Sequence, residues 1–357
     1  MEKLVKSNIQ FWNGKNVFIT GNTGFKGSWL SQLLIMEGAN VRGYSDTPTY
    51  TPILSNILKH QNIFETVRAD IKDFNKLKRS VVEFQPDIIF HLAAQPLVRE
   101  SYQNPVETYS TNVLGTLYLL ESARELEKPV SIVNITTDKC YENKEWIWNY
   151  RENEPLGGYD PYSSSKACSE LISSAYRNSF FKNSNIKLAT VRAGNVIGGG
   201  DWSTDRLIPD SVRSFSKNES VLIRNPIAIR PWQHVLEPVY GYKDLAEKLH
   251  MNSGYDEAFN FGPLDQDCRS VQWIMDYLVE RWGDNANWVI DKSAHPHEAQ
   301  LLKLDISKVR KYLNWKPTLS LEEALDYTVD WYKAYNSGAH MIDFTIEQIK
   351  TFRKNAK

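Results

Sequence analysis

A glycine-rich loop near the start of the chain constrains the fold more than any other feature. The apolar run Val17–Thr20 is followed by the sequence GNTGFKG at positions 21–27, and a helical pattern then continues as far as Gly38. Glycines let a backbone approach a pyrophosphate closely, and the free N–H groups and dipole at a helix start favour its negative charge. The spacing GxxGxxG departs from the general GxGxxG fingerprint. In this context the loop still predicts a strand–loop–helix unit that binds a dinucleotide.

Short β-branched runs alternate with helical stretches through the first half of the chain. Strands are expected at 17–20, 40–45, 88–94, 130–136 and 186–194, and helices at 28–38, 113–128 and 162–181. This alternation is typical of a doubly wound parallel α/β sheet. After about Gly194 it loosens into the turn-rich segments GGGDW, RNP and RPW. We therefore predict a Rossmann-like domain over 1–194 with a returning segment near 232–262, and a smaller C-terminal substrate-binding lobe over 195–231 and 263–357.

Composition and charge exclude several classes of protein. The 42 basic and 43 acidic residues give a net charge of -1, so no global field attracts nucleic acid. No stretch approaches the roughly 20 apolar residues of a membrane span, and the N-terminus lacks the apolar region of a signal peptide. Three cysteines without CxxC spacing, Cys140, Cys168 and Cys268, indicate neither a disulfide framework nor a zinc site. We expect a cytoplasmic protein with no nucleic-acid or membrane partner.

A tyrosine and a lysine carry the clearest catalytic signal. In Tyr162-Ser-Ser-Ser-Lys166 the two side chains are four residues apart in a helical stretch, so they share one face. A phenol with a pKa of about 10 is a poor base at neutral pH, and a nearby ammonium lowers that pKa. Thr137 follows a predicted strand, where its hydroxyl could bond the substrate oxygen during proton transfer. This set predicts hydride transfer at a hydroxyl-bearing carbon.

Several segments together resemble the extended short-chain dehydrogenase/reductase family: GNTGFKG, HLAAQ at 91–95, Thr137 and YSSSK. Within it, RAGNVIGGGDW and RPWQHV resemble the nucleotide-sugar 4,6-dehydratases, and NITTDKCYENKEWIW is most similar to those that act on CDP-glucose. The resemblance covers nearly the whole chain. It implies NAD as cofactor, CDP-glucose as substrate, and a homodimer or homotetramer paired through two helices, one of which carries YSSSK.

The cofactor contacts follow from the loop and the resemblance. Asp46 is the nearest acidic candidate for the adenosine ribose, and Asp70 for the adenine edge. Arg42 and Lys26 could instead meet a 2′-phosphate, so the loop leaves NADP open. The expected cofactor-binding residues are Gly21, Thr23, Gly24, Phe25, Lys26, Gly27, Asp46, Asp70, Ile71, Leu92, Ala93, Ala94, Tyr162 and Lys166.

The resemblance also implies a sequence of reactions. Oxidation of the sugar at C4 makes the C5 hydrogen acidic, a base removes it, an acid protonates the departing C6 hydroxyl, and hydride returns to C6. Asp138 is the candidate acid, which requires a carboxyl that is protonated at the working pH; the alternative is a cap of a helix or loop. Lys139 replaces the glutamate that the dTDP-glucose dehydratases carry as base. It is either the C5 base or a group that holds the Asp138 carboxyl or an enolate oxygen.

Arginines of the second half are candidates for the substrate diphosphate, because a guanidinium fork matches phosphate geometry. Arg230, in RPWQHV, matches the family's phosphate-binding arginine most closely. Surface charge is the alternative for Arg206 and Arg224. The expected substrate-binding residues are Gln95, Asn195, Arg206, Arg224, Arg230 and His297. The sequence HPHE at 295–298 does not signal a metal-ligand geometry, so no metal is predicted.

Two alternatives stay open beside a CDP-glucose 4,6-dehydratase. One is a dehydratase or epimerase for another nucleotide sugar, because the identity of the base rests on the resemblance. The other is an NAD(P)-sensing regulator that kept the fold and lost catalysis. Such a regulator should have lost its reacting side chains, whereas Thr137, Asp138, Tyr162 and Lys166 are all present.

Overall fold

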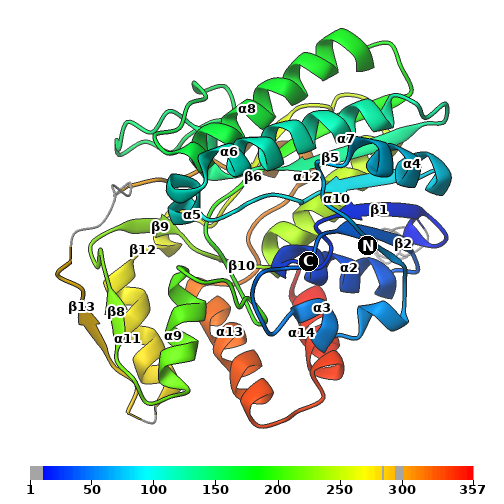
Figure 1. Cartoon of the computed structure of the whole chain (residues 1–357). Helices are drawn as coiled ribbons and strands as arrows, with labels where there is room; N and C mark the ends of the chain where they lie inside the picture. The colour runs from blue at the N-terminus through cyan, green and yellow to red at the C-terminus, as the bar shows by residue number, and fades with distance from the viewer. Residues whose placement is uncertain (1–10, 284, 294–300, 357) are drawn as a thin grey trace.

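A seven-stranded parallel sheet forms the centre of the protein (Figure 1). The structure is a computed structural model that describes residues 11–283, 285–293 and 301–356. The strand order is β11-β6-β5-β4-β1-β2-β3, the order of a dinucleotide-binding fold with one strand added. The predicted doubly wound α/β sheet is therefore confirmed. Its strands are β1 (Asn16–Thr20), β2 (Asn40–Ser45), β3 (Thr66–Arg68), β4 (Ile88–His91), β5 (Val130–Ile135), β6 (Ile186–Ala193) and β11 (Ala258–Phe261).

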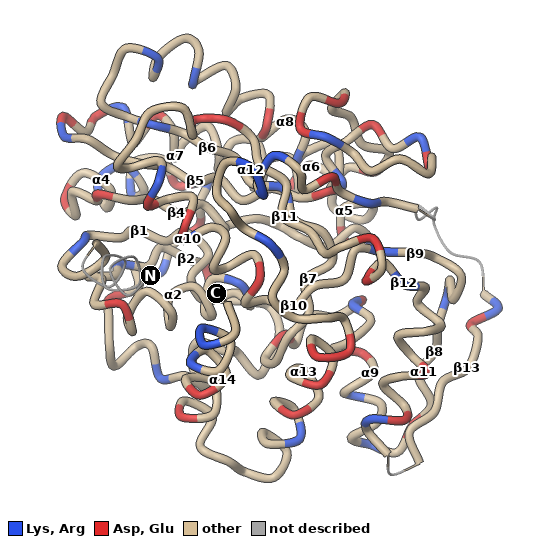
Figure 2. The backbone as a smooth tube through the Cα atoms, turned by 180° about the vertical axis from the view of Figure 1, so that it is seen from behind, with Lys and Arg blue, Asp and Glu red and all other residues tan. Residues whose placement is uncertain are grey.

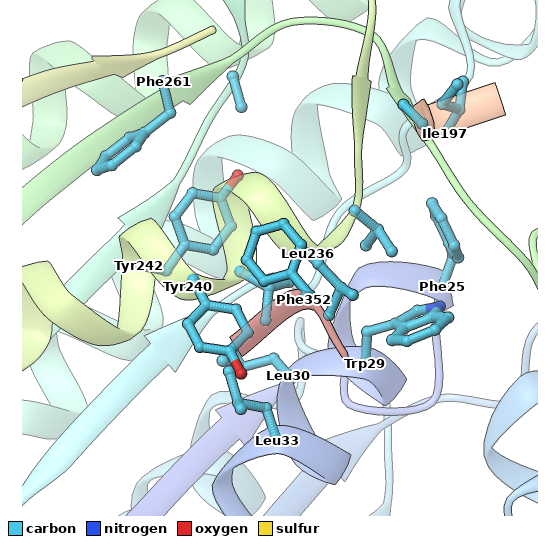
Figure 3. Close-up of a cluster of buried hydrophobic side chains, with 14 of the residues drawn as sticks. Phe25, Trp29, Leu30, Leu33, Ile197, Leu236, Tyr240, Tyr242, Phe261 and Phe352 are labelled. Atoms are coloured by element: carbon cyan, nitrogen blue, oxygen red, sulfur yellow. The ribbon is translucent and has the colours of Figure 1, made fainter. Parts of the chain in front are cut away.

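Side-chain alternation along the strands feeds a core on each face of the sheet. In β1, Val17 and Ile19 join the cluster around α2 (Phe25–Met36) and α10 (Leu236–Met251), whereas Phe18 joins the cluster beneath α4 (Phe74–Phe84), α7 (Gly115–Ala123) and α8 (Pro161–Tyr176). Figure 3 shows the first cluster, in which Leu33 of α2 and Tyr240 of α10 lie together. Because both faces are covered, the central strands β4 and β5 are buried at every residue.

All three helical predictions shift at their boundaries. The helix expected at 28–38 is α2, which runs from Phe25 to Met36. The helix expected at 113–128 is α7, which ends at Ala123 and follows a π-helical turn at 110–114. The helix expected at 162–181 is α8, which continues in a π-helical turn at 177–181. Asp160 caps α8 by accepting a hydrogen bond from the Ser163 amide at 2.9 Å, and Pro161 occupies its first position. This cap places Tyr162 in the first turn of α8.

The second half of the chain builds small sheets beside the main one. The paired strands are β8 (Val221–Ile223) with β13 (Trp288–Ile290), β9 (Ile229–Pro231) with β12 (Cys268–Ser270), and β7 (Val196–Ile197) with β10 (Gln233–His234). Helices of this half are α9 (Leu207–Phe215), α11 (Val271–Trp282), α12 (Ser307–Leu313), α13 (Leu321–Asn336) and α14 (Met341–Asn355); α3 (Leu54–Ile57), α5 (Val98–Gln103) and α6 (Pro105–Tyr109) are short helices of the first half.

The segment between 232 and 262 returns to the main sheet. It supplies α10, which contacts β5 and β6, and β11, which pairs with β6. The division into two lobes stays a prediction. The last helix departs from the predicted division. The ring of Phe352 in α14 lies 4.9 Å from that of Tyr240 in α10, and Arg353 pairs with Glu37 at the end of α2. We therefore propose that α14 belongs with the larger domain.

Charges of both signs are distributed over the backbone (Figure 2). Among the residues that the structure describes, no helix is long and apolar enough to cross a membrane. Within the same residues, no group of three or more His, Cys, Asp or Glu side chains is arranged to hold a metal ion. Cys140, Cys168 and Cys268 form no disulfide.

Candidate active site

The glycine loop joins β1 to α2 at the carboxyl edge of the sheet. A Cβ on Gly21, whose φ is +72°, would lie 2.7 Å from the Ala93 amide nitrogen, and a Cβ on Gly27 would lie 2.2 Å from the Gly21 carbonyl oxygen. Both positions therefore require glycine for packing. A Cβ on Gly24 would meet only the Gly21 oxygen, at 3.4 Å. Gly24 thus borders open space at the uncapped start of α2, which fits a pyrophosphate.

The residues predicted to bind the adenosine end of the cofactor follow β2 and β3. Thr23 bonds Ser45 at the end of β2, with 2.7 Å between the hydroxyl oxygens, and Asp46 comes next and is exposed. Asp70 follows β3, and Arg68 donates to the Asp46 carbonyl at 3.4 Å. The other predicted cofactor residues lie in the loops after β3 and β4 and at the start of α2: Phe25, Ile71, Leu92, Ala93 and Ala94. All of these residues lie where ligands bind in open α/β sheets.

The two basic residues considered for a 2′-phosphate are engaged elsewhere. Arg42 pairs with Glu65 at 2.8 Å and lies over the Phe84 ring at 4.7 Å. Lys26 lines the cavity that holds Tyr162. Arg68, which donates to the Asp46 carbonyl, is a further basic residue at the adenosine end that the sequence motifs did not indicate.

One cavity of about 1060 Å³ unites the predicted chemistry. It is lined by side chains from the ends of β5 and β6, the first turns of α2 and α8, and the segments around α9, β8 and β9. The predicted site residues in its lining are Lys26, Thr137, Lys139, Tyr162, Asn195, Arg206, Arg224 and Arg230. Asp138 and Lys166 are buried and are not among the lining residues. Residues from Lys26 to Leu302 therefore meet at one place.

Burial governs the acid–base properties of the tyrosine and lysine. Burial raises the pKa of Tyr162 to about 12, whereas a hydrogen bond with Thr137 and the charge of Arg206 both lower it. Burial also lowers the pKa of Lys166 to about 8, which the charge of Glu170 opposes. The Lys166 ammonium donates to the Ile135 carbonyl at 3.2 Å. Loss of hydration is the largest influence on the Tyr162 pKa, and Lys166 is not among the groups that shift it most, so a lowering by Lys166 stays a prediction.

Asp138 and Lys139 form a pair at the end of β5. Asp138 is fully buried, and its Oδ1 accepts from the Thr137 hydroxyl at 3.0 Å and from the Lys139 ammonium at 3.3 Å. Its Oδ2 has no hydrogen-bond partner among the described residues. Lys139 also donates to Asn195 Oδ1 at 3.3 Å. An ammonium that donates to two oxygens is suited to hold Asp138, and an unpartnered carboxyl oxygen is suited to carry a proton.

The three arginines approach the cavity from different segments. Arg206 precedes α9 and donates to Asp201 at 2.9 Å. Arg224 follows β8 and lies 3.9 Å from Asp205. Arg230, in β9, is 8% exposed. Three guanidinium groups along one cavity supply the charge that a diphosphate requires. Arg99, which pairs with Asp205 at 2.8 Å, also lines it and was not predicted.

Two predicted substrate residues are not part of the described cavity lining. The Gln95 side chain is used by its own loop: its amide nitrogen donates to Leu97 at 3.1 Å and to Thr108 at 2.8 Å, and its oxygen accepts from the Leu97 amide. These contacts give Gln95 a structural role and argue against a substrate contact. His297 lies outside the described residues.

Comparisons with known proteins agree with this geometry. A profile of the GDP-mannose 4,6 dehydratase family matches residues 18–328. The chain belongs to this family. Among the family's relatives, CDP-glucose 4,6-dehydratase of Salmonella typhimurium is 54% identical over 349 residues, which cover 96% of this chain and 97% of that protein. The dTDP-glucose 4,6-dehydratase of the same organism is 25% identical, over 89% of this chain and 92% of its own.

Solved structures support the same family fold. A dTDP-glucose 4,6-dehydratase from Bacillus anthracis in complex with NAD superposes with a TM-score of 0.76, at 21% identity over 92% of this chain and 100% of its own. A UDP-glucose 4-epimerase from Thermotoga maritima with UDP-glucose gives a TM-score of 0.77, at 24% identity over 90% of this chain and 99% of its own. At these identities the likeness establishes the fold, which is shared by dehydratases and epimerases.

Proposed function

We propose that this protein is an NAD-dependent CDP-glucose 4,6-dehydratase, which converts CDP-D-glucose to CDP-4-keto-6-deoxy-D-glucose and water. The observation that carries the proposal is the single cavity in which Thr137, Lys139 and Tyr162 face three arginines. The relative at 54% identity supports CDP-glucose as the substrate. The intact polar set argues against a regulator that lost catalysis.

The glycine loop supports a dinucleotide by its shape. Packing fixes Gly21 and Gly27, while the open side of Gly24 leaves room for a pyrophosphate. NAD bound there supplies the acceptor for the hydride of C4 and the donor of the hydride that returns to C6. Asp46 is placed for the ribose hydroxyls, and its negative charge would disfavour a 2′-phosphate.

Tyr162 and Thr137 act on the C4 hydroxyl. The Thr137 hydroxyl holds the oxygen of the C4 hydroxyl group. Tyr162 takes the proton of that hydroxyl group as the hydride leaves C4. Arg206 favours the deprotonated phenol by its charge, in opposition to burial. The product of this step is a C4 ketone, which makes the C5 hydrogen acidic.

Asp138 and Lys139 act on the elimination. A basic side chain of the cavity takes the C5 proton, the electron pair forms the C5–C6 double bond, and the C6 hydroxyl leaves as water with a proton from Asp138 Oδ2. Lys139 holds Asp138 through Oδ1. Hydride then returns to C6 and a proton to C5, so the cycle has no net redox change.

The test is incubation with glucose linked to CDP, dTDP, UDP or GDP in heavy water. We expect a 6-deoxy-4-keto product with deuterium at C5 from CDP-glucose. Product from dTDP-glucose alone would refute the CDP assignment. An epimer that keeps its C6 hydroxyl would refute dehydration and favour the epimerase alternative.

Assembly into a homodimer or homotetramer also stays a proposal. Apolar side chains are exposed on α6, α8 and the turn after α8: Val106, Tyr109, Leu171 and Phe180. These residues lie on the helix that carries Tyr162 and Lys166 and on its neighbour, and exposed apolar patches favour protein contacts. Light scattering of the wild-type protein and Leu171→Glu tests the pairing, which predicts a smaller assembly for the variant. A cytoplasmic location remains a prediction.

A further inference from the structure

Lys26 lies in the glycine loop but faces the catalytic cavity. It is the second residue of α2 and lines the same cavity as Thr137 and Tyr162. The charged groups that act on it come from three other segments: Arg206 before α9, Lys166 of α8, and Asp138 and Lys139 of the turn after β5. Three of these four groups are cations.

An ammonium is poorly accommodated at this place. Its Nζ makes no hydrogen bond to any residue in the described part of the chain. The start of α2 adds the positive end of a helix dipole. Burial, followed by the charges of Arg206 and Lys166, lowers the pKa of Lys26 to about 7, and Asp138 opposes the shift. Before a ligand binds, a substantial fraction of the Lys26 side chain is therefore neutral at pH 7.

We infer that Lys26 takes up a proton when a diphosphate enters this cavity, and then contacts it as an ammonium. Two sources of a diphosphate reach the region. The pyrophosphate of a dinucleotide fits the loop that contains Lys26, and the diphosphate of a sugar nucleotide fits the arginines that include Arg206. Either anion would outweigh the repulsion among the cations and favour the charged amine. The ligands rest on the proposed function, whereas the proton uptake does not depend on dehydration.

This inference gives Lys26 a role beyond holding the cofactor. A residue that is neutral when the site is empty and charged when it is filled links ligand affinity to pH. Uptake per ligand bound should be on the order of 0.1 proton at pH 6 and should approach one proton near pH 8. Lys166, with a pKa of about 8, adds a smaller share at neutral pH. The difference between wild type and a Lys26 variant isolates the contribution of Lys26.

Titration calorimetry tests the inference without turnover. NAD alone and CDP alone are titrated at pH 7.5 in three non-phosphate buffers with different ionisation enthalpies. The slope of the observed enthalpy against the buffer enthalpy gives the protons taken up. We expect wild-type uptake with at least one ligand, and a loss of more than half of it in Lys26→Met. The ligand that shows the loss is the one that Lys26 contacts.

Two further variants complete the design. Lys78→Met removes a lysine on α4 that pairs with Glu125 far from the cavity, and should keep the wild-type slope. Lys26→Arg keeps a charge that does not titrate, so it should bind with little proton uptake and lose less affinity than Lys26→Met between pH 7 and 9. Buffer-independent enthalpies for the wild type, or equal slopes for wild type and Lys26→Met, would overturn the inference. Normal proton uptake without dehydration of CDP-glucose would refute only the proposed activity.

Discussion

Two clusters of buried charge lie close to each other in the protein, and they are built in opposite ways. On α8, Glu170 pairs with Arg192 at 2.9 Å, and both side chains are at most 4% exposed. The carboxylate also accepts from Thr136 at 2.5 Å and from Thr190 at 2.7 Å. One helical turn earlier, around the catalytic cavity, the cations Lys26, Lys139, Lys166 and Arg206 outnumber the buried carboxylates Asp138 and Asp201.

The difference shows which cluster supports the fold and which supports chemistry. Burial raises the pKa of Glu170. The charge of Arg192 and the hydrogen bonds from Arg192, Thr136 and Thr190 lower it by more, so the pKa of Glu170 lies below its usual value. This cluster is electrically balanced before any ligand arrives. At and beside the cavity, neither Lys26 Nζ nor Asp138 Oδ2 has a hydrogen-bond partner among the residues that the structure describes. Unbalanced groups of this kind are retained where a ligand or a proton will complete them.

The largest expected effect comes from removing the negative charge of Glu170, which balances Arg192. Glu170→Gln leaves the Arg192 guanidinium buried without a counter-charge, which should lower the free energy of unfolding by about 3–5 kcal/mol. Urea unfolding measures the loss. The double variant Glu170→Gln with Arg192→Met removes both charges and should recover much of the stability. A single variant as stable as wild type would contradict a structural role for this pair.

Removing Lys139 should affect chemistry more than stability. Lys139→Met takes away the donor to Asp138 Oδ1, so elimination should slow by on the order of 100-fold while C4 oxidation continues. Reduced cofactor should then accumulate, which its absorbance reports. Tyr162→Phe is the matched control, because it should prevent the first step and yield no reduced cofactor. Dehydration at the wild-type rate in Lys139→Met would rule out any role in elimination.

Two glycines of the glycine loop differ in a similar way, because one supports the fold and the other is placed for a ligand. Gly27 is packed against the Gly21 carbonyl, whereas Gly24 borders open space. Gly24→Ala should therefore leave the unfolding temperature nearly unchanged but weaken NAD binding by about 10-fold, since the methyl group occupies the approach of the pyrophosphate. Gly27→Ala should destabilise the fold itself. Calorimetry of NAD binding and thermal unfolding separate the two effects, and equal behaviour of the two variants would contradict the assignment of Gly24.

The sequence predicts the sheet well because its signals are local. The run at 40–45 matches β2 residue for residue, and the loop at 21–27 starts α2 as expected. Gln95 could not be placed, because the partners of its amide lie in a loop and a helix that pairwise spacing does not reveal. The pKa of Tyr162 could not be predicted from the sequence either, because it depends on how completely the fold buries this side chain. The sequence shows that Lys26 lies inside the glycine loop, but only the fold shows that its side chain lines the catalytic cavity.

The smallest expected effect has the opposite sign to the first. The pKa of Lys26 is about 7 in the folded protein and 10.5 in its ordinary state. Between these values the unfolded chain binds more protons, so the stability of the wild type rises with pH across that window. Lys26→Met removes this penalty and should raise the unfolding temperature of the ligand-free protein by about 2 °C at pH 7. The gain should be smaller at pH 9, because the unfolded chain then gains less free energy by protonating Lys26. Calorimetry at both pH values, with Lys78→Met as control, measures it; a lower unfolding temperature of Lys26→Met at pH 7 would show that Lys26 is balanced like Glu170.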